Sequence, residues 1–146
     1  MHAVPHPSEL KKALLARGFE VYRTTADEVV LADRVRDNLL MDSAVAARTG
    51  ATLSVRVVVR AAAGDFPGES PDQLLGRARR LAEAAAPRGY TEIATRTLPI
   101  HDPGDRTRTL DTWYEVWLLR GVADAEELFS ELTHALTLPK VADATP

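Results

Sequence analysis

The sequence predicts an α+β fold in which an antiparallel β-sheet carries about three helices on one face. Three observations support this class: a strictly alternating strand over residues 53–60, a helix with strong start and stop signals over residues 70–89, and the element order α-β-β-β-α-β-β-α. Each amphipathic helix has one apolar stripe to bury, and a sheet with one apolar face is the natural partner. The other face of the sheet is then left for water or for a partner.

The length and the charge balance restrict the class of protein and the number of domains. The chain has 146 residues and a net charge of −3, with 45% hydrophobic and 27% charged residues. These values predict one domain over residues 8–139, between a flexible arm at 1–7 and a tail at 140–146. They exclude a disordered chain, a collagen-like chain and a strongly basic nucleic-acid binder, and the sequence has no run of 18 apolar residues typical of a membrane span.

Cysteine is absent, which excludes disulfides and zinc sites built on thiolates. The first residues do not resemble a secretory signal, so we expect a cytoplasmic protein. Arginine outnumbers lysine 15 to 3, and alanine is very common, as in proteins of GC-rich bacterial genomes. Selection of arginine for phosphate or carboxylate binding is the less favoured explanation, because the arginines are scattered along the chain.

The N-terminal third predicts a helix followed by a hairpin. Ser8 suits an N-cap and Gly18 suits a helix end, which predicts a helix over about residues 9–17. Residues 19–23 and 28–32 are rich in β-branched and aromatic side chains and predict two paired strands.

Residues 33–50 admit two interpretations. Val35, Leu39, Leu40 and Ala44 fit a helical stripe, but the segment also fits an irregular strand, which we favour because a clear strand follows. That strand places on its core face Leu53, Val55, Val57 and Val59, and on its wet face Ser54, Arg56, Val58 and Arg60.

The second half predicts helix, strand, strand and helix. Ser70, Pro71 and Gln73 form a capping box with proline at the first helical position, and the helix extends to about Ala86. Two strands follow over about 91–98 and 112–120, joined by a polar loop at 99–111, and the last helix begins at Asp124 and ends before Pro139.

The element order resembles that of the class I type III secretion chaperones and the related YbjN-like proteins. Three segments carry the resemblance: Leu14-Leu15-Ala16-Arg17-Gly18-Phe19, the capped helix around Leu74 to Ala82, and Leu119-Arg120-Gly121-Val122-Ala123-Asp124. The resemblance covers most of residues 8–138 by topology more than by motif, and residues 33–50 and 99–111 are long for it. It implies a small acidic homodimer that binds other polypeptides and has no catalytic residues.

The candidate interface residues are aromatic or basic. Trp113 and Trp117 are four residues apart, an even spacing, so they share one face of a strand whose other face carries Tyr114. Exposed tryptophans mark an interface, and buried ones would simply belong to the core. Arg56 and Arg60 point to one side and can clamp an anion, cover a wet face or pair with Glu115.

Two loops hold the remaining candidates. Phe66 precedes a helix N-terminus, where it either contacts a partner or packs against the helix. The 99–111 loop contains potential metal ligands or general bases, although its spacing matches no known metal motif and its Asp-Pro-Gly-Asp run is typical of a turn: His101, Asp102, Asp105 and Asp111.

The sequence has no phosphate-binding glycine loop, nucleophile elbow or zinc-protease motif, and we expect no cofactor. The preferred hypothesis is a non-catalytic, bacterial, protein-binding or chaperone-like module that forms a homodimer through its sheet. Its expected partner is a protein or a second copy, with neither nucleic acid nor membrane. The alternatives are a metal-dependent or small-molecule activity at residues 100–111 and a structural subunit of a larger assembly.

Overall fold

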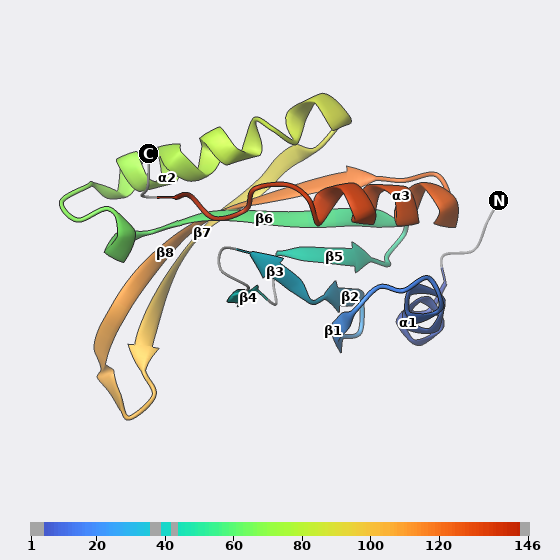
Figure 1. Ribbon diagram of the computed structural model, residues 1–146, viewed down its shortest axis with the longest axis horizontal. Helices are drawn as coiled ribbons and strands as arrows, with labels where there is room; N and C mark the ends of the chain where they lie inside the picture. Colours follow the sequence, from blue (N-terminus) through green and yellow to red (C-terminus); the bar gives the residue numbers. More distant parts are fainter. Residues whose placement is uncertain (1–4, 36–38, 42–43, 144–146) are drawn as a thin grey trace. The chain divides into compact units, whose positions relative to one another are not determined.

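The described residues form three α-helices and a six-stranded antiparallel sheet with strand order β1-β2-β5-β6-β8-β7 (Figure 1). The computed structural model describes residues 5–35, 39–41 and 44–143. The elements are α1 (Pro7–Ala16), β1 (Val21–Thr24), β2 (Glu28–Leu31), β3 (Asp33–Val35), β4 (Leu39–Met41), β5 (Val45–Arg48), β6 (Ser54–Ala62), η2 (Ala63–Asp65), α2 (Pro71–Ala82), η3 (Ala86–Arg88), β7 (Thr91–Asp102), β8 (Asp105–Gly121) and α3 (Ala125–Ala135). The predicted α+β class is confirmed, but the predicted element order is wrong: six strands, not three, separate the first two helices.

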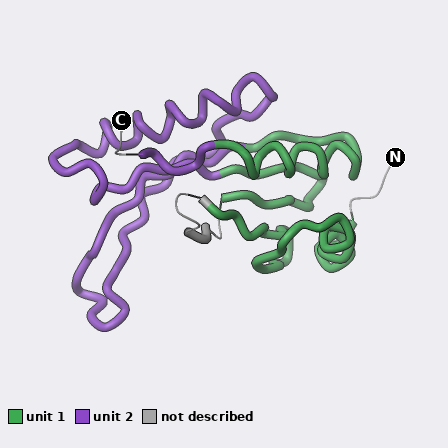
Figure 2. The backbone as a smooth tube through the Cα atoms, viewed as in Figure 1, with its two compact units in different colours: residues 1–57, 119–138 green, residues 58–118, 139–146 purple. Residues whose placement is uncertain are grey.

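The chain divides into two compact units (Figure 2). Unit 1 contains residues 1–57 and 119–138, and unit 2 contains residues 58–118 and 139–146. Strands β6 and β8 each contribute residues to both units. The single domain expected over residues 8–139 stays a prediction.

Helix α1 begins two residues earlier than its sequence suggests. His6, rather than Ser8, is the N-cap, because its imidazole Nδ1 accepts a hydrogen bond from the Ser8 N–H at 3.2 Å. The helix ends where predicted, at Gly18, whose φ of +89° lies in the left-handed region that favours glycine. The Gly18 and Phe19 N–H groups donate back to the helix in a Schellman motif, which turns Phe19 towards α3.

Residues 33–50 form short strands, so the strand interpretation of this segment is confirmed. Strands β3 and β4 pair with each other as a separate two-stranded sheet, and β5 joins the main sheet between β2 and β6. Residues 36–38 and 42–43 lie outside the described residues.

In unit 1 the register of β2, β5 and β6 separates an apolar face from a polar one. Val29, Ala47 and Val55 are register partners on one face, whereas Glu28, Arg48 and Ser54 are partners on the other. Helix α1 packs on β1 and β2, and α3 packs on β5. Successive side chains of β6 therefore point to opposite faces of the sheet, with the same two sets of residues that we predicted for 53–60.

In unit 2 the predicted capping box of α2 is present. Ser70 Oγ accepts from the Gln73 N–H, and Gln73 Oε1 accepts from the Ser70 N–H. The helix then packs Leu74 against Ala61 of β6. It ends at Ala82, four residues before the predicted end, and η3 follows.

The predicted loop at 99–111 is instead part of a long hairpin. Strand β7 continues to Asp102 and β8 starts at Asp105, so only Pro103 and Gly104 form the turn. The end of this hairpin extends beyond β6 and α2 (Figure 1). Its residues are mostly exposed on both faces, including Leu110 at 52%.

The described residues form no helix that is long and apolar enough to cross a membrane.

Candidate protein-binding face

Strand β8 presents its two tryptophans on the face opposite α2. Tyr114 packs against the cluster that contains Leu74 of α2, so its alternate neighbours Trp113, Glu115 and Trp117 point to the other side of the sheet. Both tryptophans are half-buried. This answers the question that the sequence left open, because the tryptophans do not belong to the core that α2 covers.

A guanidinium group lies over each of these indole rings. The Cζ atom of Arg60 is 3.6 Å from the ring centroid of Trp113, and that of Arg96 is 4.0 Å from the ring centroid of Trp117. Both distances are well inside the range of cation–π attraction. We call these four residues, together with Glu115, the Arg–Trp face.

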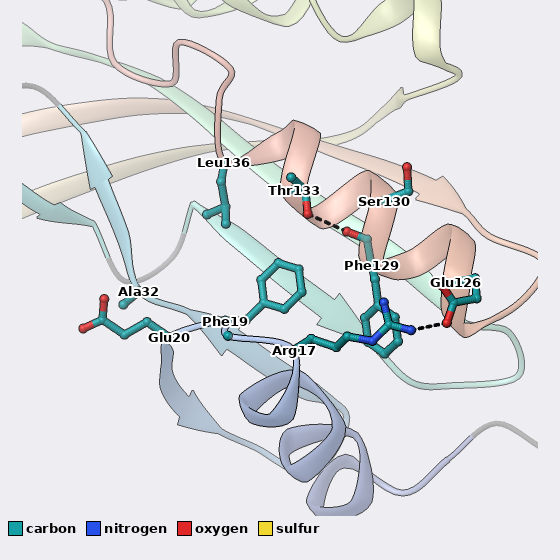
Figure 3. Close-up of a pocket in the computed structure, with 10 residues that line it drawn as sticks. Arg17, Phe19, Glu20, Ala32, Glu126, Phe129, Ser130, Thr133 and Leu136 are labelled. Carbon is teal, nitrogen blue, oxygen red and sulfur yellow. Dashed lines mark hydrogen bonds and ion pairs between the residues drawn. The ribbon is translucent and has the colours of Figure 1, made fainter.

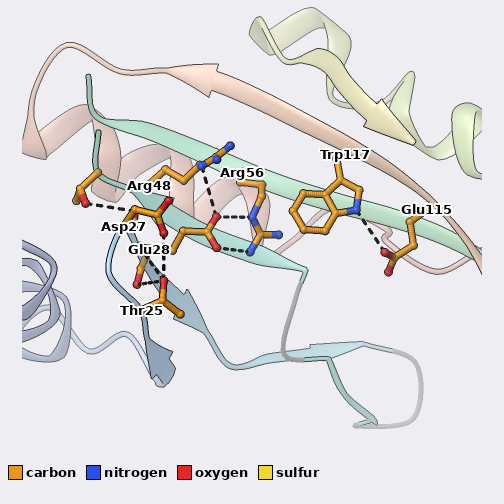
Figure 4. A network of polar contacts seen from close by, with 8 residues as sticks. Thr25, Asp27, Glu28, Arg48, Arg56, Glu115 and Trp117 are labelled. Atoms are coloured by element: carbon orange, nitrogen blue, oxygen red, sulfur yellow. Dashed lines mark hydrogen bonds and ion pairs between the residues drawn. The ribbon is translucent and has the colours of Figure 1, made fainter. Parts of the chain in front are cut away.

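Glu115 provides the negative charge of the Arg–Trp face. Its side chain is 3% exposed, and its Oε1 accepts a hydrogen bond from Trp117 Nε1 at 3.3 Å (Figure 4). This bond fixes the orientation of the indole ring. The face thus offers flat, oriented aromatic surface with the exposed charge of Arg96, whereas Arg60 and Glu115 are buried.

Arg56 does not form the anion clamp that its spacing from Arg60 allowed. Its Nε donates to Glu28 Oε2 at 2.7 Å, and Arg48 Nε lies 3.6 Å from the same oxygen (Figure 4). The guanidinium is therefore engaged with a carboxylate inside unit 1. Arg56 is 1% exposed, and every residue of β6 is buried, so the expectation that one face of this strand is wet is wrong.

Phe66 and Tyr114, two predicted contact residues, belong to the core of unit 2. Phe66 is buried and packs with Leu74 at the start of α2, while Arg77 lies over its ring at 3.9 Å. Tyr114 is partly buried against the same cluster. Phe66 therefore has the packing role at the start of α2 that was the alternative for it, and a partner contact by Tyr114 stays a prediction.

Three acidic side chains of the hairpin accept hydrogen bonds from backbone N–H groups. Asp102 Oδ1 accepts from the Gly104 N–H, and Asp111 Oδ1 accepts from the Gly64 N–H, both at 2.8 Å. The hydroxyl and N–H groups of Thr107 donate to Asp105 and lower the pKa of that carboxyl.

His101 is exposed on the same hairpin. Within the described part of the chain, no three histidine, aspartate or glutamate side chains are grouped so that they could hold a metal ion. Asp102 and Asp105 thus accept hydrogen bonds within the hairpin and Asp111 accepts one from Gly64, and the metal or general-base role of this segment stays a prediction.

A cleft of about 700 Å³ lies in unit 1 between the end of α1 and helix α3 (Figure 3). Its floor is aromatic, with the rings of Phe19 and Phe129 stacked at 6.3 Å between centroids. Arg17 lies over the Phe129 ring and forms an ion pair with Glu126, and Glu20 pairs with Arg34. The charged groups at the rim are thus engaged with protein partners, so we do not assign the cleft a ligand.

Sequence reasoning missed Arg96, Glu28 and the role of Glu115 as an acceptor. Arg96 lies on β7, next to β8 in the sheet, and only the pairing of these strands brings its side chain over Trp117. One signal could have indicated Arg96, because a tryptophan on a partly covered face of a sheet often contacts a basic side chain of the neighbouring strand.

Comparisons with protein-family models, with curated proteins and with solved structures find no match to this chain. The resemblance to type III secretion chaperones and YbjN-like proteins stays a prediction.

Proposed function

We propose that this chain is a non-catalytic polypeptide-binding module of the bacterial cytoplasm and that it forms a homodimer through the Arg–Trp face. The observation that carries the proposal is the placement of Trp113 and Trp117, half-buried, on the side of β8 opposite α2. Tryptophan and arginine are the side chains most enriched among the residues that dominate binding energy at interfaces.

The aromatic surface of the face favours a second copy as its occupant. Arg96 is the exposed charge of the face, whereas Arg60 and Glu115 are buried, so the surface that a partner would meet consists mainly of the two indole rings. A twofold interface uses the same patch on both subunits, so the indole rings of one copy can pack against those of the other.

The edges of the sheet are less suited to this contact than the face. Strand β1, at one edge, has four residues and an irregular register with β2. Strand β7, at the other edge, contains Pro99, which has no N–H group to donate to an added strand. Short strands, bulges and prolines are the features by which sheet edges avoid pairing with other chains.

Sedimentation velocity on the purified chain tests the proposal. We expect a dimer for the wild-type chain and a monomer for the double variant Trp113→Ala/Trp117→Ala, with the far-UV circular dichroism of the fold retained. Tyr22→Ala is the matched control, because Tyr22 is an exposed aromatic on β1, in unit 1, and its loss should leave the dimer intact.

A wild-type chain that stays monomeric up to about 100 μM, well above the dissociation constant of a specific interface, would contradict the proposal. So would a double variant that loses stability but keeps its mass.

A further inference from the structure

The C-terminal segment of the chain lies against β6 as a short added strand. The Arg60 N–H donates to the Lys140 carbonyl at 2.9 Å, and the Ala142 N–H donates to the Arg60 carbonyl at 2.8 Å. Val141 is therefore the parallel partner of Arg60. All four residues belong to unit 2, and residues 140–142 of the predicted tail pair with β6.

The segment occupies the edge of β6 that faces β5. The Leu53 carbonyl accepts from Val122 N–H, just after β8, so the odd-numbered residues of β6 direct their backbone groups towards β8. The even-numbered residues, including Arg60, face the opposite edge. Strand β5 pairs with residues 54–57 only, so beyond Val57 this edge is covered by residues 140–142 in the described structure.

Two side chains of the segment are buried, and that of Ala142 packs in the core of unit 2. Lys140 is 2% exposed and Ala142 is 6% exposed, whereas Val141 between them is only partly buried. Ala142 packs among Ala61, Phe66 and Leu74. This is the alternation of a bound strand, with a shallow apolar site that suits a small side chain and, two residues before it, a site for a basic one.

We infer that this edge of β6 is an acceptor site for an extended peptide of a partner polypeptide, and that residues 140–142 are its intramolecular occupant. The peptide would pair in parallel with Arg60 and carry a basic residue followed, two positions later, by a small apolar one. Chain ends held by few contacts open most readily, which allows a partner to replace the segment. The site goes beyond the proposed dimer, because it uses a strand edge and not the Arg–Trp face.

Fluorescence polarisation of a labelled peptide with the sequence of residues 138–146 tests this inference on the full-length chain. Ala142→Pro removes the N–H that donates to Arg60 and should release the tethered segment. Because a tethered segment competes at an effective concentration of the order of millimolar, we expect the variant to bind the peptide at least about tenfold more tightly than the wild-type chain does.

Val141→Pro is the matched control. It introduces the same ring, but in a parallel pairing with Arg60 the N–H of Val141 points away from β6. This variant should bind the peptide as the wild-type chain does. A peptide that carries aspartate in place of Ala142 should not bind any of the three proteins.

Equal binding of the native peptide to all three proteins, or no binding to a folded Ala142→Pro variant, would overturn the inference. Hydrogen exchange on the wild-type chain gives an independent test, also if Ala142→Pro does not fold. The Arg60 amide should exchange at least about tenfold faster than the Arg56 amide, which faces β5. Equal protection of the two amides would show that the segment does not open and would overturn the inference as well.

Discussion

Arg56 and Arg60 lie four residues apart on the same face of β6 and are both buried, yet their guanidinium groups contact different kinds of side chain. Arg56 donates to the carboxylate of Glu28 across the sheet of unit 1, whereas the guanidinium of Arg60 lies over the indole ring of Trp113 in unit 2. A buried ion pair strictly requires its partner, because loss of the carboxylate leaves an uncompensated charge. A stacked guanidinium depends more on its planar shape.

Other arginines combine both arrangements. Arg77 donates to Glu69 at 2.7 Å while lying over Phe66, and Arg17 pairs with Glu126 while lying over Phe129. The excess of arginine over lysine therefore has a structural use in this chain, since a planar guanidinium can stack and donate at once. These arginines are scattered along the sequence, but in the fold each lies over an aromatic ring from another part of the chain.

The largest expected effect breaks the Arg56 arrangement. Glu28→Gln keeps the shape of the side chain but removes the charge that balances buried Arg56, and we expect a loss of about 3 kcal/mol in the free energy of unfolding. Urea unfolding followed by far-UV circular dichroism measures this loss.

The double variant Glu28→Met/Arg56→Met is the control for that measurement. Because both charges are then gone and the volume is filled, most of the lost stability should return. A loss below about 1 kcal/mol for Glu28→Gln would show that the pair behaves as a solvent-screened surface pair.

A smaller effect is expected at the Arg60 stack. Arg60→Lys keeps the charge but loses the planar contact with Trp113, and we expect a loss of about 1 kcal/mol. Arg96→Lys is the matched control, because Arg96 lies over Trp117 in the same way but is exposed, so it should lose at most about half as much. Indole fluorescence during urea unfolding reports on this comparison, since both tryptophans belong to unit 2. Equal losses of unfolding free energy in the two variants would contradict the idea that burial strengthens the arginine–tryptophan contact.

The smallest effect concerns Glu69, which supports the ring-stacked Arg77. The hydrogen bond from Arg77 lowers the pKa of the Glu69 carboxyl, and the attraction of the nearby positive charges acts in the same direction. A carboxyl with a lowered pKa stabilises the fold above the pKa of an unfolded glutamate, about 4.3, and this contribution is lost as the pH falls through the lower folded value.

The melting temperatures of the wild-type chain and of Glu69→Gln, measured from pH 7 down to about pH 3, test this point. The difference between them should shrink as the pH falls. A difference that does not change with pH would mean that the carboxylate charge of Glu69 contributes nothing to stability.

Local signals explain what the sequence could predict. The start of α2 depends on Ser70 and Gln73, which lie in the same turn, and the face assignment of Val55 and Arg56 depends only on alternation along one strand. The end of α1 similarly follows from Gly18 alone. Each of these features is decided within a few neighbouring residues, so no knowledge of the tertiary structure is needed.

Features that depend on distant residues were missed or left open. The hairpin strands around Leu98 and Leu110 are exposed on both faces, so they lack the alternation that identifies a strand, and the Asp-Pro-Gly-Asp turn made the whole segment resemble a loop. The face of Trp113 could not be chosen, because the residues on both sides of β8 are apolar. The ring beneath each arginine comes from another element, which spacing along the chain does not reveal.

The interleaving of the two units has a practical consequence. The backbone passes from one unit to the other after Val57, after Leu118 and again after Leu138, so neither unit corresponds to a single stretch of the gene. A cut of the chain at any single position divides at least one of the two units between the two fragments. The roles of the two units are therefore best separated by point substitutions or circular permutation. Two fragments expressed separately would not reproduce both units.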